Sequence, residues 1–545
     1  MKRRILFCLS VVLLLGLSAA CSGGPEAGGP GGAAPGTELA GEVLRIVGDE
    51  PDTVDPQCTS EHYNVALNVF DRLVEVRPLP GGTSEIRPSL AESWEISPDG
   101  REYTFHLHEN VVFSNGSPLT SSDVGFTLTR LLTHPDACNR DLAEEILGAE
   151  ALENGETDTL EGFRILSDRD FVITLKAPCA AFLACLSTPG ASILDEESTT
   201  EAGDGFGTDP ALTVGTGPFR LLEMNAGSGM LMEANAGCWS GPPRCRGLAV
   251  HYVGDTETRR LMFENGKLDI LDLEDIGGEA EYFIHGDIYQ DQLRHGPRVG
   301  ITYLALNQSV EPLGDVRVRR ALQLALDRKL LLDAVYSGRG TVENGILPRG
   351  LIGHNPDLPA IPFDPEAARA LLREAGYGDG FDLEISVSGV PTENTMDLLK
   401  IIVSMWEEVG VRAAVVSLDE DDYMTRRKAG QLACYLSNWS ADYNDPNNFL
   451  YTFFGSRENT DGRSLCYPDE AVMERVRQAR SIVDEEQRIR AYQDLERRII
   501  QEDAAWIPLF SREHYFVINK RVKGFQVPWN GWSNTCYRDV ALASP

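Results

Sequence analysis

The sequence lacks the short motifs by which many hydrolases and metalloenzymes are recognised. No HExxH, GxSxG or SxxK pattern occurs, and the nine histidines are scattered along the chain. No CxxC pair and no Cys/His cluster has the spacing of a metal site. These absences argue against an enzyme, so we expect no catalytic residue, no metal and no cofactor.

Positive charge is also scarce. The chain carries 49 Lys and Arg residues against 83 Asp and Glu residues, which gives a net charge of −34 at pH 7. Such a surface repels phosphate backbones and anionic lipid headgroups. We therefore expect no nucleic-acid partner, and any membrane attachment should be covalent rather than electrostatic.

Residues 1–21 have the pattern of a targeting segment. An apolar stretch at residues 5–17 follows a basic start, and small residues lead to Cys21. The stretch is too short for a transmembrane helix, which needs about 20 residues. Residues 17–21 resemble the lipobox of bacterial lipoproteins, which implies a lipid anchor on Cys21; the alternative is ordinary signal-peptidase cleavage after Ala20. Both alternatives place the mature protein outside the cytoplasm.

Residues 22–40 and the cysteines carry two further predictions. The segment 22–40 is rich in Gly and Pro and has too little apolar surface to fold, so it should be a flexible tether. Nine of the eleven cysteines lie beyond Cys21, and because this number is odd, at least one should be a free thiol. By loop length, the best candidates for disulfides are two pairs, Cys179/Cys185 and Cys238/Cys245.

Strand and helix patterns alternate along the rest of the chain. Residues 43–47 form a short apolar strand pattern, and residues 94–108 predict a β-hairpin with a Pro-Asp-Gly turn. Runs at 383–387 and 413–417 read as strands on either side of a helix at 396–409. This alternation predicts α/β layers with a largely parallel sheet.

Helix starts are marked at three places by side chains that can cap the first turn. Thr120 with Asp123 has the spacing of a capping box, and Asp315 precedes a helix with one apolar face. Asp364 precedes a proline at the first helical position. A further helix should run through Tyr63, with its apolar period extending to Leu73.

Eight short segments in fixed order resemble those of the family 5 extracellular solute-binding proteins, which include the oligopeptide-, dipeptide- and nickel-binding components of ABC importers. The resemblance runs from about Leu44 to about Val527. The segments are TVDP at 53–56, PSLAESWE at 88–95, FSNG at 113–116, GTGPF at 215–219, GKLDI at 266–270, VRVRRA at 316–321, DPE at 364–366 and WSADYNDP at 439–446.

The resemblance implies an α/β, two-lobed periplasmic-binding-protein fold of the cluster C type, with an extra subdomain inserted in lobe I. Lobe I would comprise 41–303, with the insertion at about 80–210. Lobe II would be 304–508, and 509–545 would return to lobe I. The function that the resemblance implies is capture of a short peptide between the lobes by hinge closure, followed by delivery to the ABC permease. We expect the protein to act as a monomer.

The same resemblance nominates four side chains for the ligand site. In peptide-binding members, the aspartate of the Ala-Asp-Tyr segment pairs with the amino terminus of the ligand, and Asp442 is its counterpart here. Trp439 and Tyr443 flank it and are candidate cleft walls, as is Tyr63. The structural alternatives are that Asp442 caps a turn or pairs with an arginine and that the aromatic side chains only pack in the core.

One feature departs from the dipeptide-specific members of the family. Their carboxylate-binding arginine falls within the segment corresponding to residues 388–394, which contains no arginine here. A longer peptide or another amine-bearing ligand is therefore expected. The alternative ligands within the family are a nickel or other metal chelate and an oligosaccharide.

Overall fold

The structure is a computed structural model that describes residues 42–59, 63–79, 84–530 and 535–543. The predicted signal peptide at 1–21, the tether at 22–40 and the lipidation site Cys21 lie outside the described residues. No helix in the described part of the chain is both long enough and apolar enough to cross a membrane.

A four-stranded sheet of order β1-β10-β9-β8 contains the strand predicted at residues 43–47. Its strands are β1 (Val43–Gly48), β8 (Phe219–Asn225), β9 (Gly229–Ala234) and β10 (Gly247–Tyr252). β1 pairs with β10 in parallel, and the other two pairs are antiparallel. Helix α1 (Tyr63–Val69) packs on this sheet through a shared core that includes Val65 and Phe70.

The helix predicted through Leu73 is shorter than its apolar period. It ends at Val69 because the chain then passes from one core to another: Phe70 is buried with the β1 sheet, whereas Leu73 is buried in a different core that spans residues 73–214. The apolar spacing therefore continues although the helix does not.

A second four-stranded sheet, β4-β5-β7-β6, contains the predicted hairpin. Its strands are β4 (Ala91–Ile96), β5 (Glu102–Leu107), β6 (Phe163–Ile165) and β7 (Asp170–Thr174), and β2 (Val74–Pro78) pairs with β3 (Ser84–Pro88) nearby in the sequence. Helix α2 (Ser121–Thr133) covers the core of this region. It begins with the capping box predicted from Thr120 and Asp123, so that prediction is confirmed.

The largest sheet has the order β11-β18-β13-β17-β15-β16, with β12 and β14 also paired to β18. These strands are β11 (Ile270–Asp272), β12 (Leu293–Pro297), β13 (Gly300–Leu306), β14 (Gly340–Val342), β15 (Phe381–Ser388), β16 (Val411–Leu418), β17 (Cys434–Ser440) and β18 (Trp506–Ile518). Among the described strands of this sheet, the parallel pairs are β15 with β16 and β15 with β17. The prediction of a largely parallel sheet is wrong, because the βαβ pattern at β15, α11 (Glu393–Glu408) and β16 says nothing about the direction of the other strands.

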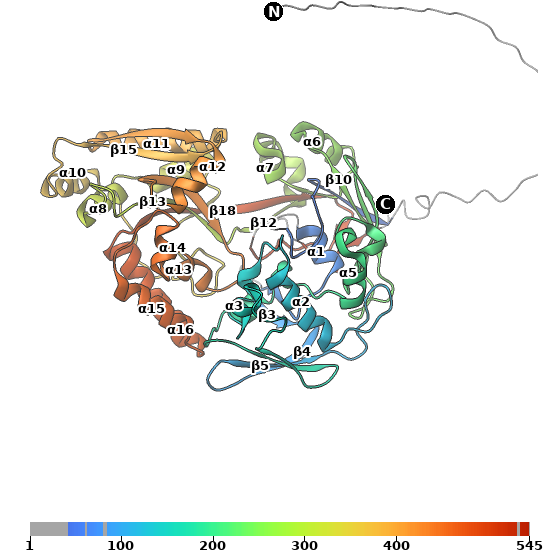
Figure 1. Ribbon diagram of the computed structural model, residues 1–545. Helices are drawn as coiled ribbons and strands as arrows, with labels where there is room; N and C mark the ends of the chain where they lie inside the picture. The colour runs from blue at the N-terminus through green and yellow to red at the C-terminus, as the bar shows by residue number, and fades with distance from the viewer. Residues whose placement is uncertain (1–41, 60–62, 80–83, 531–534, 544–545) are drawn as a thin grey trace, which may run out of the picture. The chain divides into compact units, whose positions relative to one another are not determined.

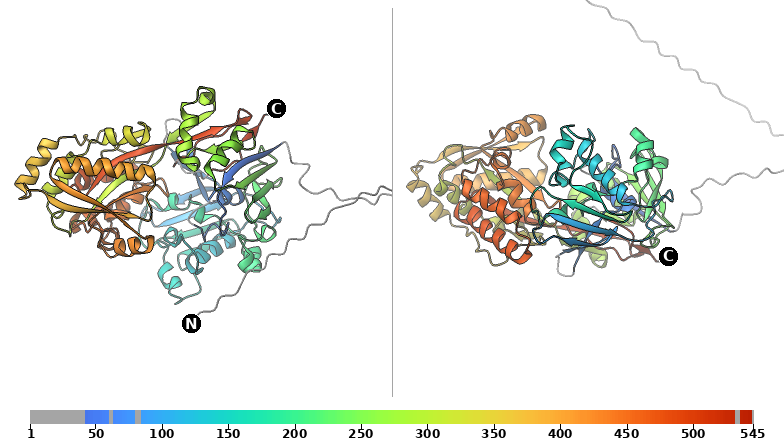
Figure 2. Two further views of the ribbon diagram at one scale, coloured as in Figure 1. Left: turned by 90° about the horizontal axis from the view of Figure 1, so that it is seen from above. Right: turned by 60° about the horizontal axis from the view of Figure 1, so that its bottom comes forward.

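Strand β18 connects two sets of elements. Its first half, through Phe510, pairs with β13, and its second half, from Glu513 onward, pairs with β12 and β11. Figure 1 shows β18 as a long red arrow running from the yellow and orange elements toward green α6 (Thr256–Glu264) and α7 (Ala280–His285). The left view in Figure 2 shows the same connection from above.

Helices surround the second half of the chain and enclose two further cores. Asp315 and Asp364 cap α8 (Val316–Leu324) and α10 (Pro365–Glu374), as predicted. The remaining long helices are α9 (Arg328–Tyr336), α12 (Glu420–Lys428), α13 (Asn447–Phe454), α15 (Glu470–Arg480) and α16 (Glu485–Glu496). One core lies between β13 and α13, α15 and α16, and the other between β15 and α8, α10 and α11.

All nine cysteines beyond Cys21 are free thiols. The prediction of at least one free thiol is confirmed, and the two predicted disulfides are wrong. The thiols of the second pair have other partners: Cys245 Sγ lies 3.0 Å from the carbonyl of Val540, and Cys238 Sγ lies 3.8 Å from that of Thr216. Cys179 lies three residues before the short helix α4 (Phe182–Cys185), and Cys185 is the last residue of that helix.

Candidate ligand-binding site

A cavity of about 530 Å³ lies among segments that are far apart in the sequence. Its walls come from the end of β1, the start of α1, the 3₁₀ turn at Arg140–Leu142, residues 188–189 and the loop that follows β17. The predicted site residues Tyr63, Asp442 and Tyr443 all line it. The fold therefore brings together residues that are almost 400 positions apart.

Asp442 presents its carboxylate to this cavity. Asn448 holds the residue in place from α13, since its Nδ2 donates to Asp442 Oδ2 at 2.9 Å and its Oδ1 accepts from the Asp442 backbone N–H at 3.0 Å. Among the described residues, no ion pair reaches this carboxylate. The side chain is open to the water of the cavity but is surrounded by protein, and this partial desolvation raises the pKa of Asp442.

Tyr443 and Tyr63 form parts of the cavity wall and are themselves anchored. Tyr443 is buried in the core of residues 73–214, and its hydroxyl accepts from Asn447 Nδ2 at 2.8 Å. The Tyr63 hydroxyl donates to the carbonyl of Thr59 at 3.1 Å and lies 3.3 Å from Asn139 Oδ1. Each of these tyrosines lines the cavity and also packs against the protein. The two roles, packing in the core and forming a wall of the ligand site, are therefore compatible at these positions.

Trp439 is not part of the cavity wall as far as the structure describes it. Its ring packs edge-on against Phe453 at 5.3 Å between centroids. Its Nε1 donates to the carbonyl of Asn448 at 3.0 Å and lies 3.3 Å from Asn448 Oδ1. Trp439 therefore contacts Asn448, the residue that positions Asp442. It supports the site from behind and does not line the cavity.

Further carboxylates give the cavity an acidic character that the sequence did not reveal. Asp141 lies in the wall without an ion pair in the described part of the chain, and partial desolvation together with the nearby carboxylates of Glu144 and Asp442 raises its pKa to about 6. Asp49 and Asp275 also line the cavity, but both face Arg259, at 2.6 Å and 3.8 Å. Asp141 and Asp442 thus remain as two carboxylates able to receive a cationic group.

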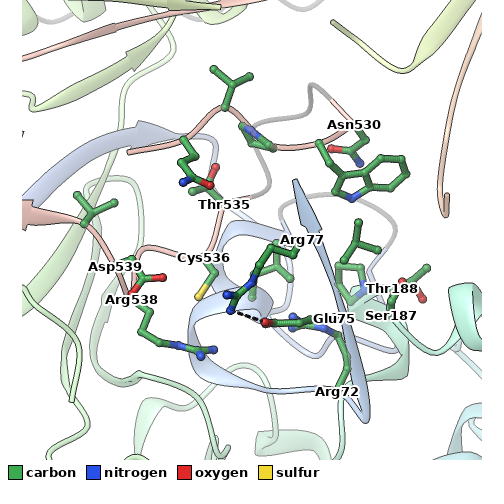
Figure 3. Close-up of a pocket in the computed structure, with 18 of the residues that line it drawn as sticks. Arg72, Glu75, Arg77, Ser187, Thr188, Asn530, Thr535, Cys536, Arg538 and Asp539 are labelled. Atoms are coloured by element: carbon green, nitrogen blue, oxygen red, sulfur yellow. Dashed lines mark hydrogen bonds and ion pairs between the residues drawn. The ribbon is translucent and has the colours of Figure 1, made fainter. Parts of the chain in front are cut away.

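A smaller cavity of about 320 Å³ adjoins the first (Figure 3). Four residues line both cavities: Thr188, Pro189, Asp442 and Asn530. The smaller cavity is lined by arginines, which come from the segment between α1 and β3 and from the C-terminal segment. Glu75 and Asp539 line it as well, so Asp442 lies between an acidic cavity and one lined by both arginines and acids.

A third cavity, of about 460 Å³, involves the segment that lacks the arginine of dipeptide-specific proteins. Thr392 and Asn394 line it together with Arg339 and Arg512. Both arginines are already ion-paired: Arg339 with Glu281, and Arg512 with Glu274 at 3.2 Å. Among the described residues that line it, this cavity therefore offers no unpaired guanidinium to a carboxylate.

Comparison with known proteins identifies the family. Residues 85–461 match the family described as "Bacterial extracellular solute-binding proteins, family 5 Middle". Heme-binding protein A of Haemophilus influenzae is 30% identical over 476 residues, covering 85% of each chain. The dipeptide-binding protein of Escherichia coli is 29% identical over 500 residues, covering 88% of this chain and 90% of that protein.

A solved structure agrees with this relationship. HbpA2 from Haemophilus parasuis superimposes with a TM-score of 0.78 at 29% identity, covering 92% of this chain and 99% of that chain. The predicted two-lobed α/β fold of periplasmic binding proteins is thereby confirmed.

Proposed function

Because the chain belongs to the bacterial extracellular solute-binding proteins of family 5, we propose that it captures short peptides in its acidic cavity and passes them to the permease of an ABC importer. The ligand's α-ammonium group meets Asp442, with Asp141 adding negative charge beside it. Main-chain and terminal groups are common to all peptides, so a site that reads them binds varied sequences.

The observation that carries this proposal is the unpaired Asp442 carboxylate in the wall of a cavity of about 530 Å³. Asn448 fixes its position without neutralising its charge. Arg463 acts on this carboxylate electrostatically but forms no ion pair with it among the described residues. The carboxylate can therefore receive a cation from a ligand, and charge-assisted hydrogen bonds of this kind are the stronger ones. The acidic cavity favours an ammonium-bearing ligand over heme, whose two propionates are negative.

We assign lobe I to residues 41–303 and 509–545, with an inserted subdomain at about 80–210, and lobe II to residues 304–508. The chain would pass between the lobes at 303/304, within β13, and at 508/509, within β18. A hinge at these two positions is supported because the two halves of β18 pair with different strands. Closure of the lobes would bury the ligand and create the form that docks on the permease.

The remaining parts of the proposal concern location. We propose that residues 1–20 are removed, that Cys21 becomes the first residue of the mature protein and carries a lipid, and that 22–40 tether a monomeric binding protein to the outside of the cell membrane. Globomycin, which blocks lipoprotein signal-peptide cleavage, should cause the precursor to accumulate in cells expressing the full chain, whereas a Cys21→Ser variant should be released in soluble form.

Native mass spectrometry of freshly purified protein tests the function directly. We expect adducts with the masses of short peptides, which exchange for an added tripeptide that is recovered intact. Recovery of cleaved peptide would indicate an enzyme. Adducts that contain only metal, heme or sugar, with no binding of any added peptide, would contradict the proposal.

A further inference from the structure

The smaller cavity contains a buried arginine, Arg72, that has no counter-ion among the residues the structure describes. Arg72 precedes β2 and is 5% exposed. Its Nη1 donates one long hydrogen bond, of 3.4 Å, to the carbonyl of Phe70, and its Nε has no hydrogen-bond partner. No ion pair joins Arg72 to a carboxylate in the part of the chain that the structure describes.

The nearest acid in the sequence is already occupied by other groups. Asp71 is buried, accepts a hydrogen bond from Trp239 Nε1 at 2.8 Å, and lies 3.6 Å from the guanidinium of Arg538. Its negative charge is therefore shared with Arg538, which also lines the smaller cavity. Among the described residues, Asp71 is thus the ion-pair partner of Arg538 and not of Arg72.

The other acids that line this cavity form no ion pair with the Arg72 guanidinium in the described part of the chain. Glu75 pairs with Arg77 at 3.0 Å (Figure 3), and Asp539 is exposed. Asp442 stands at the boundary with the acidic cavity and forms no ion pair with Arg72. Among the described residues, the two adjoining cavities thus contain a positioned carboxylate, Asp442, and a buried guanidinium, Arg72, neither of which forms an ion pair.

We infer that the smaller cavity is an anion subsite in which Arg72 receives a carboxylate of the same ligand whose ammonium group meets Asp442. A buried charge without a counter-ion is costly, and this cost is offset when an anion arrives. The planar guanidinium forms two parallel hydrogen bonds with a carboxylate, which suits this role. The inference rests on the proposed function and adds that the ligand is read at both ends, as a zwitterion.

The residue that binds the ligand's carboxylate would then be Arg72. It would not lie within residues 388–394, the segment that corresponds to the arginine of the dipeptide-specific proteins. The carboxylate source is either the C-terminus of the peptide or an acidic side chain. Both present the same group to Arg72, so matched peptides are needed to tell them apart.

Calorimetric titrations with free and amidated peptides test the inference. The ligands are Ala-Ala-Ala, its C-terminal amide, and the amide of Ala-Glu-Ala, each titrated into the wild type, Arg72→Gln and the control Arg87→Gln. Arg87 lies on the neighbouring strand β3, is exposed and pairs with Glu85. Amidation of Ala-Ala-Ala should weaken binding to the wild type and the control at least about tenfold, and should have little effect on Arg72→Gln.

These titrations distinguish failure of the anion subsite from failure of peptide binding as a whole. If Ala-Glu-Ala amide regains the lost affinity in the wild type but not in Arg72→Gln, the subsite takes an acidic side chain. Equal affinity of the wild type for all three peptides would overturn the inference and leave peptide binding intact. If none of the peptides binds, the proposed function fails, and the inference fails with it. Should Arg72→Gln not fold, the wild-type series and Arg72→Lys, which keeps the charge, decide the question.

Discussion

Replacing Asp442 by Asn should weaken peptide binding without weakening the fold. Asn has nearly the same shape, and its Oδ1 can still accept the hydrogen bond that Asn448 Nδ2 donates to Asp442 Oδ2 at 2.9 Å. What the substitution removes is the negative charge. Because the pKa of Asp442 is raised by partial desolvation, the charged form costs some stability, so the free variant should melt at the same temperature as the wild type or slightly higher.

The size of the binding loss follows from the surroundings of this carboxylate. Removing one partner of a buried charge pair costs about 2 to 5 kcal/mol. Asp442 is open to the water of the cavity in the free protein, so the lower end of that range applies. A loss of about 2 kcal/mol corresponds to a roughly 30-fold higher Kd.

Calorimetry with a tripeptide and its N-acetylated form isolates the charge contribution. Acetylation should weaken binding to the wild type, and it should weaken binding to Asp442→Asn far less, because the charge that it would leave unpaired is already absent. Asp421→Asn, an exposed change on α12, is the matched control and should behave as the wild type. A Kd for Asp442→Asn within twofold of the wild type would refute the role of Asp442.

Three further predictions concern Asp141, Glu496 and Trp439. Peptide affinity should fall as the pH falls through about 6, because protonated Asp141 no longer attracts an ammonium group. In calorimetric titrations from pH 7.5 to 5, the affinity of Asp141→Asn should fall less steeply than that of the wild type. Equal slopes would contradict this prediction. Burial raises the pKa of Glu496 to about 8. Between the ordinary pKa of a carboxyl group and pH 8, the folded state therefore keeps a proton that the unfolded state has lost. The free energy of unfolding should fall as the pH rises through this range. Glu496→Gln keeps an oxygen that can accept from two backbone N–H groups but cannot become charged. The Tm of this variant relative to that of the wild type should therefore rise from pH 5 to pH 8. A Tm difference that stays constant over this range would be evidence against the raised pKa. Trp439→Phe loses the donor to Asn448 and should raise the peptide Kd by roughly tenfold or less, so a loss larger than that of Asp442→Asn would show direct ligand contact.

The local parts of the fold could be predicted because their causes are local. The capping box of Thr120 and Asp123 and the hairpin at β4 and β5 depend on residues a few positions apart. The direction of β13 and β18 depends instead on long-range pairing, which strand and helix patterns do not encode, and the prediction of a largely parallel sheet was therefore wrong.

The site could be predicted only where a family segment marked it. Asp442 and Tyr443 belong to such a segment, and the cavity unites them with Tyr63. Asp141 and Arg72 carry no sequence signal, because their significance lies in the absence of an ion-pair partner within the described structure, and that is a property of three-dimensional packing. The disulfide predictions failed for a related reason, since spacing along the chain does not determine where two thiols point.

A crystal structure of the protein with a bound tripeptide would test the central claim most directly. The ligand's ammonium nitrogen should lie about 3 Å from the Asp442 carboxylate, and a ligand carboxylate should lie at a similar distance from the Arg72 guanidinium. A tripeptide bound in the opposite direction, or in the cavity lined by Thr392 and Asn394, would contradict the account.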